Sequence, residues 1–384
     1  MLPSLYFNVN SPDLTVNELF KSNAEGKLTL NDLAGRVKPQ NRMNANVNIQ
    51  TLGLSYTLNN KLSLSVYHAV NGNPNVDVNG NLVKLVANGN NQFLGKTVPF
   101  NSTLNGSIYG EMGIGAAYKI QSNISVGARI KLLSGVAGVF TEKNKLNVAF
   151  DPNDYSLRFD NNFDVLAYSF STYKNINGAS DLVRQGFGGS NKGMAFDVGS
   201  TIKVGKINLA ASIIDLGGAI KWQKDGKRYA SNGVYTYTGA HSDDFFNVDS
   251  LNSNSFRDTL KNIIGFKESE NPTYKQKLPA KIYLSGTYQL NEKLKLGALF
   301  YNENGGLDVS YTGFAVNATY QLLKQIQLGG TLGLRNGSFS NLGMHFVAQL
   351  GPVQLFGVTD NIISAFRPYD SKNANGRLGI NIQL

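Results

Sequence analysis

The sequence has no cysteine, and this absence excludes a disulfide scaffold, a cysteine nucleophile and thiolate metal sites. It also has no run of about 18 apolar residues, the length that a membrane-spanning helix needs, so such a helix is excluded. The first residues do not form a charged segment followed by an apolar one. No secretory signal is therefore visible, and an exported chain would have to begin after a cleaved signal.

Charged residues are also few, at 16% of the chain, against roughly 25% in soluble domains. The net charge is +10, but the basic residues are scattered singly, and no block of basic and aromatic residues indicates nucleic-acid binding. Glycine (41 residues), tyrosine (18) and phenylalanine (21) are abundant instead. This composition is typical of short strands with one wet face, and it is too apolar for a disordered chain.

Hydrophobic residues recur at every second position in one segment after another. In 326–335, for example, Ile326, Leu328, Leu332 and Leu334 alternate with polar or small residues. A strand turns its side chains to opposite faces with this period, so each segment has one apolar side. In a soluble sandwich that side faces a core, whereas in a membrane barrel it faces lipid and the wet side faces the lumen.

The lengths of the connections favour the membrane barrel. Very short turns alternate with long loops over about 11–44, 72–104, 138–191 and 223–278, and short turns at one rim with long loops at the other are typical of outer-membrane barrels. The strands are expected at 2–10, 45–58, 61–71, 105–120, 122–137, 192–205, 206–222, 279–290, 293–304, 307–321, 323–335, 338–350, 352–360 and 373–384. We therefore predict a single domain over 1–384, a closed antiparallel transmembrane β-barrel of about 14 strands with short periplasmic turns and partly helical extracellular loops.

The long loops carry local patterns of their own. Ser11 and Pro12 are suited to cap a short helix over 13–20, and 255–266 places four apolar residues on one helical face. Residues 143–151 and 154–172 fit either a further strand pair in the wall or an extracellular hairpin.

The chain resembles an uncharacterised Bacteroidota outer-membrane barrel family. The resemblance covers nearly the whole chain and rests on the order and spacing of short segments: 91–95, 113–118, 126–131, 216–222, 278–281, 359–362 and 377–381. Members of that family generally carry a signal peptide. The family is similar to barrels of the long-chain fatty-acid transporter type and to barrel subunits of type IX secretion. The resemblance implies a location in the bacterial outer membrane and the barrel fold, and it carries no activity.

Several charged residues share the parity of the wet faces, and we expect them to point into the lumen. They are Glu111, Arg129, Lys131, Asp197, Lys203, Arg335, His345 and Arg377. They could form a polar channel or orient a ligand, or they could be paired charges that merely fill the barrel. Aromatic residues near strand ends suit interfacial girdles: Tyr56, Tyr67, Tyr118, Tyr288, Phe300, Tyr301 and Tyr320.

The sequence indicates neither a metal site, nor a cofactor, nor an active site. The three histidines, His68, His241 and His345, lie on separate elements, and the acidic turns at 151–154 and 243–244 do not have the spacing of a calcium loop. A Gly-x-Ser-x-Gly elbow is missing, which argues against a serine hydrolase.

These observations favour a non-enzymatic subunit or scaffold of an outer-membrane complex, part of a secretion or assembly machinery. The alternative is a fatty-acid-transporter-type channel for small or hydrophobic molecules, and a soluble β-protein or a barrel enzyme remains a third hypothesis. The expected partners are outer-membrane lipid and other outer-membrane or surface proteins that bind the long loops.

Overall fold

The structure, a computed structural model, describes residues 4–15, 18, 30–169, 187–238, 265–304, 310–335, 338–367 and 370–383. Fourteen antiparallel strands form a closed barrel. In order around the wall they are β1 (Ser4–Asn10), β2 (Gln40–Thr57), β3 (Leu62–Gly72), β6 (Thr103–Gln121), β7 (Ile124–Phe150), β9 (Asn191–Val204), β10 (Ile207–Trp222), β14 (Ala280–Gln289), β15 (Leu294–Asn304), β16 (Tyr311–Leu323), β17 (Ile326–Arg335), β18 (Ser338–Leu350), β19 (Val353–Thr359) and β20 (Asn373–Ile382). The predicted fold class is confirmed.

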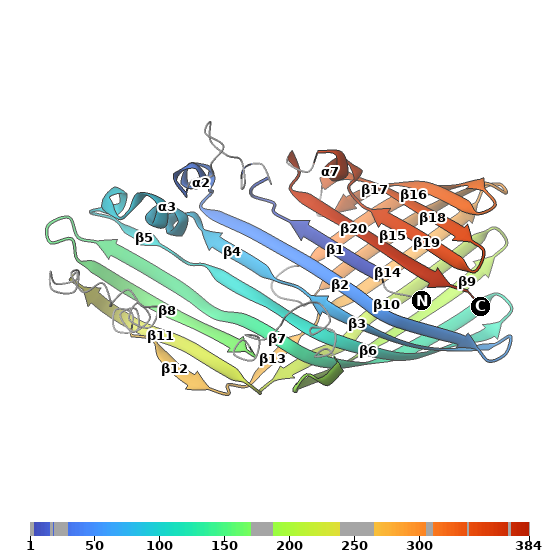
Figure 1. Cartoon of the computed structure of the whole chain (residues 1–384), viewed down its shortest axis with the longest axis horizontal. Helices are drawn as coiled ribbons and strands as arrows, with labels where there is room; N and C mark the ends of the chain where they lie inside the picture. Colours follow the sequence, from blue (N-terminus) through green and yellow to red (C-terminus); the bar gives the residue numbers. More distant parts are fainter. Residues whose placement is uncertain are drawn as a thin grey trace.

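The barrel closes because its last strand pairs with its first. β20 and β1 are antiparallel, from Ser4 opposite Gly379 to Asn10 opposite Asn373. Closure leaves no edge strand within the barrel itself. Both chain termini and the short turns lie toward one end, at the right of Figure 1, and α2 (Leu30–Arg36) and α3 (Gly80–Asn88) lie toward the other.

Side chains alternate between the two faces of the wall as the period of two predicts. On β16, Phe314, Val316 and Tyr320 are exposed on the outer face, and Ala315, Asn317 and Thr319, which alternate with that face, point inward. In β2 the register shifts between Gln50 and Leu52. The extra residue of this bulge keeps Val47 before it and Leu52 after it on the same outer face. The outer surface is therefore apolar on both sides of the irregularity.

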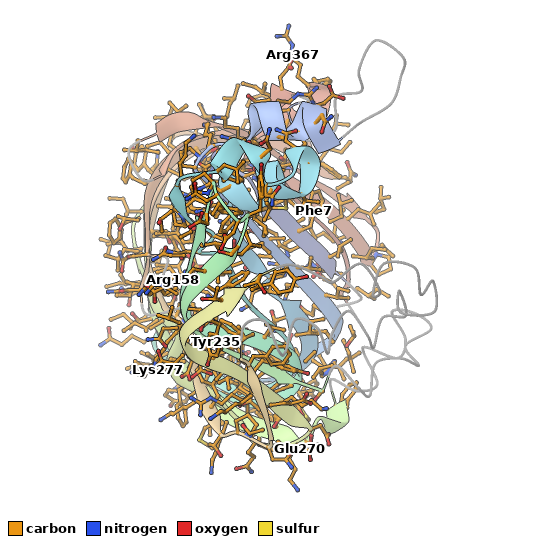
Figure 2. The ribbon with its side chains drawn as sticks, turned by 90° about the vertical axis from the view of Figure 1, so that its left-hand side faces the viewer. Phe7, Arg158, Tyr235, Glu270, Lys277 and Arg367 are labelled. Carbon is orange, nitrogen blue, oxygen red and sulfur yellow. The ribbon has the colours of Figure 1, made fainter. Side chains whose placement is uncertain are left out.

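On one side, the wall continues well beyond the barrel. Strand β7 has 27 residues, and its second half pairs with β8 (Leu157–Tyr168), which in turn pairs with β11 (Gly226–Tyr237). Shorter strands complete this extension: β4 (Asn75–Asn79), β5 (Thr97–Pro99), β12 (Lys267–Glu270) and β13 (Tyr274–Lys277). Figure 2 looks onto this end, with Arg367, just after α7, at one edge and Glu270 of β12 at the other.

The extension corrects the view of these segments as long loops. Of the two alternatives for 143–172, the hairpin is the one observed: the end of β7 and β8 pair across the turn at 151–156, and neither segment adds a strand to the fourteen of the barrel. A small apolar cluster of Phe93, Phe100, Val148 and Phe150 stabilises the tip of this pair. Turn-type residues such as Asn73-Pro74 and Asn271-Pro272 interrupt the strands, which is why the sequence pattern resembles loops there.

The helices are short: besides α2 and α3, the described residues form α7 (Ile362–Phe366) and a 3₁₀ turn at Asn91–Phe93. Ser11 is not the helix cap that the sequence predicted, because Pro12–Leu14 form a bend. Thr15 and Glu18 exchange the two hydrogen bonds of a capping box instead. The helix predicted at 255–266 lies outside the described residues except for its last two. None of the helices in the described part of the chain is long and apolar enough to cross a membrane.

Candidate functional site: the barrel lumen

The lumen contains a cavity of about 550 Å³ near the short-turn end of the barrel. Six neighbouring strands, β2, β3, β6, β7, β9 and β10, line it with inward side chains that are nearly all small. The small inward residues are Ser55, Ser63, Ser65, Gly115, Ala117, Ser125, Gly127, Gly199, Thr201, Ala210 and Ser212. These side chains are too short to meet across the interior, so the described residues leave the space between them unfilled. The cavity has the size of many small-molecule sites.

A cluster of buried charges lies next to the cavity, toward the extension; we call it the lumen ion cluster. Its members are Glu111 (β6), Arg129 and Lys131 (β7), Asp197 (β9), Asp215 (β10) and Lys281 (β14). Three cations face three anions (3 − 3 = 0), so the cluster has no net charge. Pairing of this kind is what allows charges to be buried.

Lys131 is the centre of the lumen ion cluster. Its Nζ lies 2.8 Å from Asp215 Oδ1, 2.9 Å from Asp197 Oδ1 and 3.5 Å from Glu111 Oε1, and only 5% of its side chain is exposed. The ammonium group has three donors, and three carboxylates surround it. Arg129 and Lys281 bind the outer sides of the cluster, with 3.4 Å to Asp197 and 2.8 Å to Asp215.

Asp215 reaches the lumen only because β10 is irregular. The inward residues of β10 are Ala210 and Ser212, and simple alternation would turn residue 215 outward. The register against β9 shifts on both sides of Leu216, and Asp215 itself has a φ of 61°. Its backbone N–H donates to Asp197 Oδ1 at 3.0 Å. The bulge therefore supplies the third carboxylate.

Sequence reasoning missed two members of the cluster, for different reasons. Lys281 has the inward parity of β14 and could have been found by it. Asp215 has the outward parity, and the one sequence signal for its bulge is the following Gly217-Gly218 pair, of which Gly217 has a φ of 66°.

Tyr67 joins the cluster from β3. Its hydroxyl donates to Glu111, and the guanidinium carbon of Arg129 lies 4.7 Å from the centre of its ring, within cation–π range. The position opposite the ring is Gly113, where an added Cβ would lie 2.0 Å from a ring carbon. Only glycine leaves room for the ring in this orientation.

The prediction of an interfacial girdle was wrong for Tyr67 and Tyr301. Both residues alternate with the outward positions of their strands, so their side chains point into the lumen. Tyr301 donates to Glu303, and its ring packs 4.9 Å from that of Tyr283. The other five aromatic residues are exposed on the outer face: Tyr56, Tyr118, Tyr288, Phe300 and Tyr320.

The remaining predicted lumen residues do not join the cluster. His345 lies 3.1 Å from the hydroxyl of Thr319, and Arg377 donates to Ser4 at 3.4 Å. The backbone of Arg335 pairs opposite Gly313, and its side chain lies outside the described part. Lys203 is exposed at the end of β9. A ligand-orienting role for these four residues stays a prediction. Within the described ranges, no three histidine, aspartate or glutamate residues are grouped so as to hold a metal ion, and His241 lies outside them.

A buried aromatic cluster lies beyond the ions, toward the extension. It contains Phe140, Tyr168 and Trp222, packed with Tyr109, Leu133, Leu166, Ala195, Ile220 and Leu278. Trp222 Nε1 donates to Gln276 at 3.0 Å, and Gln276 donates to Ser107 at 2.8 Å. Ser107 is on β6 and Gln276 on β13, which are not neighbours in the sheet. The wall therefore curves around the aromatic rings, and this curvature brings β6 and β13, which are not paired in the sheet, into hydrogen-bond contact.

A model of a family of unknown function (DUF5723) matches residues 1–360, and no curated protein matches the sequence. The toluene transporter TbuX of Ralstonia pickettii is 10% identical with a TM-score of 0.43, and the alignment covers 100% of this chain and 89% of that one. The toluene transporter TodX of P. putida is 9% identical with a TM-score of 0.43, and the alignment covers 100% of this chain and 89% of that one. A FadL homologue of Pseudomonas aeruginosa is 10% identical with a TM-score of 0.39, and the alignment covers 98% of this chain and 87% of that one.

Proposed function

We propose that this chain, which belongs to the DUF5723 family of unknown function, is a bacterial outer-membrane channel for small molecules. The observation that carries the proposal is the cavity of about 550 Å³ inside the barrel. The hypothesis is the alternative that the sequence left open, and we favour it over a scaffold of a secretion or assembly complex.

Membrane placement is supported by the outer face of the wall. Large apolar side chains are exposed there on strands all around the barrel; examples are Leu54 (58%), Ile114 (56%), Phe314 (48%) and Leu378 (60%). In water such a surface would be costly, whereas in lipid it is required. The closed hydrogen-bonded wall meets the second requirement of a bilayer, that backbone groups be satisfied within the protein.

The small side chains that line the cavity support a channel rather than a scaffold. A barrel that serves only to hold partners gains nothing from a row of serine, glycine and alanine residues along six strands, because larger inward side chains would fill the space and add packing energy. A solute that crosses the barrel needs that space. Binding of other outer-membrane or surface proteins to the long loops stays a prediction, as does the absence of enzymatic activity.

The lumen ion cluster indicates the class of solute. Because its charges cancel, it sets up no strong field of one sign in the passage. An ionic solute would have to compete with ion pairs of 2.8–2.9 Å around Lys131. We therefore expect small uncharged molecules to pass more readily than anions or cations.

The test is to fill the cavity from two sides. In the double variant Ser65→Phe/Ser212→Phe, two rings occupy space that strands β3 and β10 leave free, and we expect the rate of liposome swelling with small uncharged sugars to fall at least about fivefold. Leu54→Phe, on the outer face of β2, is the matched control and should leave the swelling rate unchanged. Equal swelling rates for wild type and the double variant, with both correctly folded, would exclude passage through this cavity.

A further inference from the structure

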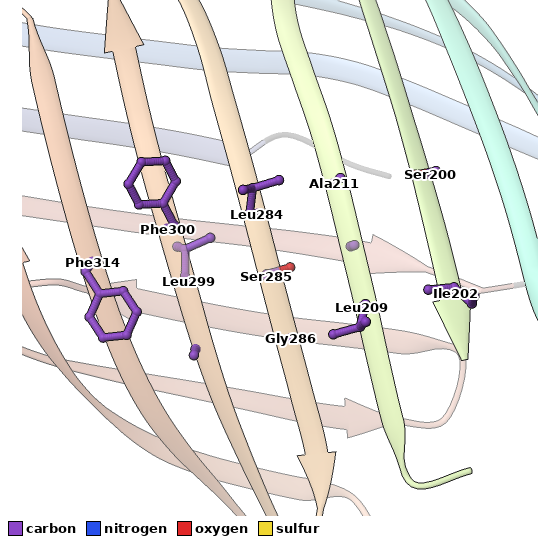
Figure 3. A pocket seen from close by; sticks show the side chains of 12 residues that line it. Ser200, Ile202, Leu209, Ala211, Leu284, Ser285, Gly286, Leu299, Phe300 and Phe314 are labelled. Carbon is purple, nitrogen blue, oxygen red and sulfur yellow. The ribbon is translucent and has the colours of Figure 1, made fainter. Parts of the chain in front are cut away.

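The outer face of the barrel carries an apolar groove of about 400 Å³ across β9, β10, β14, β15 and β16 (Figure 3). Its floor is made of small residues: Ser200, Ala211, Gly286 and Ala298. Larger apolar side chains border it, among them Ile202, Leu209, Leu284, Phe300 and Phe314. Figure 3 shows Phe300 and Phe314 on the near side of their strands, with the opposite wall of the barrel behind them.

The strand register places the floor in two neighbouring rows. Ser200 lies opposite Ala211 in one row, and Gly286 lies opposite Ala298 in the next. Each row continues into large residues, since Ala211 lies opposite Leu284 and Gly286 opposite Leu209, so the small residues form a depression rather than a smooth surface. The depression has the width of a few strands, and its lining has almost no polar side chain.

The rim below this groove is strongly basic. The short turns and the strand ends next to them carry Lys61, Lys119, Lys203, Lys206, Lys293, Lys295 and Lys324. All seven are exposed, and Glu292 is the one acidic residue among the described residues of these turns. The rim therefore has a net charge of +6 (7 − 1). The lysines are scattered along the sequence, and the barrel brings them to one level.

Two of the lysines lie at the foot of the groove. Lys206 is three residues from Leu209, which corresponds to roughly 10 Å along a strand. Its carbonyl accepts a hydrogen bond from Gln289 at the end of β14 (2.9 Å). Lys293 lies in the turn that joins β14 to β15. The two ammonium groups thus come from turns directly below the strands that form the floor.

We infer that this surface binds an anionic phospholipid, with an acyl chain in the groove and the phosphate at Lys206 and Lys293. The inference rests on the proposed membrane placement. The apolar groove fits a hydrocarbon chain. The positively charged rim lies next to the end of the groove, where the negative phosphate of a lipid with its chain in the groove would be. A zwitterionic lipid offers the same chain without net charge, and it should bind less tightly.

The experiment is native mass spectrometry of the full chain in detergent, titrated separately with phosphatidylglycerol and with phosphatidylcholine of the same acyl chains. We expect wild type to bind phosphatidylglycerol about tenfold more tightly than phosphatidylcholine, and Lys206→Gln/Lys293→Gln to remove that difference. Ala298→Phe, which fills the groove, should weaken binding of both lipids. Lys61→Gln/Lys119→Gln is the matched control, with the same charge change on the same rim, and it should change the affinities less than twofold.

Equal binding of the two lipids by wild type would overturn the inference. An equal loss of phosphatidylglycerol affinity in both double lysine variants would also overturn it, because the lipid would then respond only to the general positive charge of the rim. A dimer mass that Ala298→Phe abolishes would assign the groove to a second copy of the chain instead. Liposome swelling separates this inference from the proposed function. Lys206→Gln/Lys293→Gln should swell like wild type, and a wild type that does not swell would count against the channel alone.

Discussion

Lys131→Met is expected to lower the free energy of unfolding by about 3–5 kcal/mol, the usual cost of leaving buried charges without their partner. The Lys131 ammonium group lies within 3.5 Å of three carboxylates. Without it, Glu111, Asp197 and Asp215 would face one another, with Arg129 and Lys281 bound only at the edges of the cluster. The loss should appear as a lower urea midpoint, followed by the fluorescence of the single tryptophan.

Restoring neutrality is the control for this variant. Lys131→Met/Asp197→Asn has two cations and two anions, and it should recover a large part of the lost stability because no excess charge is left in the lumen. If Lys131→Met unfolds at the urea concentration of wild type, the ion cluster is not a buried, closely paired network. If the double variant is no more stable than Lys131→Met, charge balance is not what the lysine provides.

Trp222→Ala should cost about 3–5 kcal/mol, the range for deleting a large buried aromatic side chain. Trp222 is fully buried and packs against Phe140 and Tyr168, with ring centres 5.6 and 5.5 Å away. Gly135 and Gly138 provide the space for its ring, since an added Cβ would lie 2.8 and 3.2 Å from it. The deletion leaves a cavity, and it also removes a donor from buried Gln276.

Trp222→Phe separates the two contributions. It keeps most of the ring but loses the hydrogen bond to Gln276, and it should cost about 1–2 kcal/mol. Because the tryptophan probe is lost in both variants, unfolding is followed by the shift in gel mobility on heating. A cost below about 1 kcal/mol for Trp222→Ala would show that the wall does not close around this ring.

The strands were predictable because lipid and lumen impose opposite requirements on alternate residues. All fourteen barrel strands lie where the period of two placed them, and even β10 was recognised despite its bulge. The same rule explains Glu111, Arg129, Lys131 and Asp197, which occupy inward positions and lie together in one cluster. Their contacts with one another depend on the register between strands, which alternation within a strand does not contain.

The features that were missed depend on tertiary structure. Asp215 points inward through a bulge that shifts the parity of β10. Strand β11 of the extension pairs with β8, which lies far away from it in sequence. The basic rim is made of single lysines from separate turns, and only the antiparallel topology collects them. A pattern within one segment cannot reveal features that arise between segments.

The central claim is that the wall of the barrel has lipid on one face and water on the other. Because the chain has no cysteine, single cysteines at Phe314, Ala315, Val316 and Asn317 of β16 report on it directly, in protein reconstituted into vesicles. A membrane-impermeant maleimide should label the cysteines at 315 and 317 through the lumen and leave those at 314 and 316 unlabelled. Equal labelling at all four positions, or labelling of 314 and 316 alone, would contradict the claim.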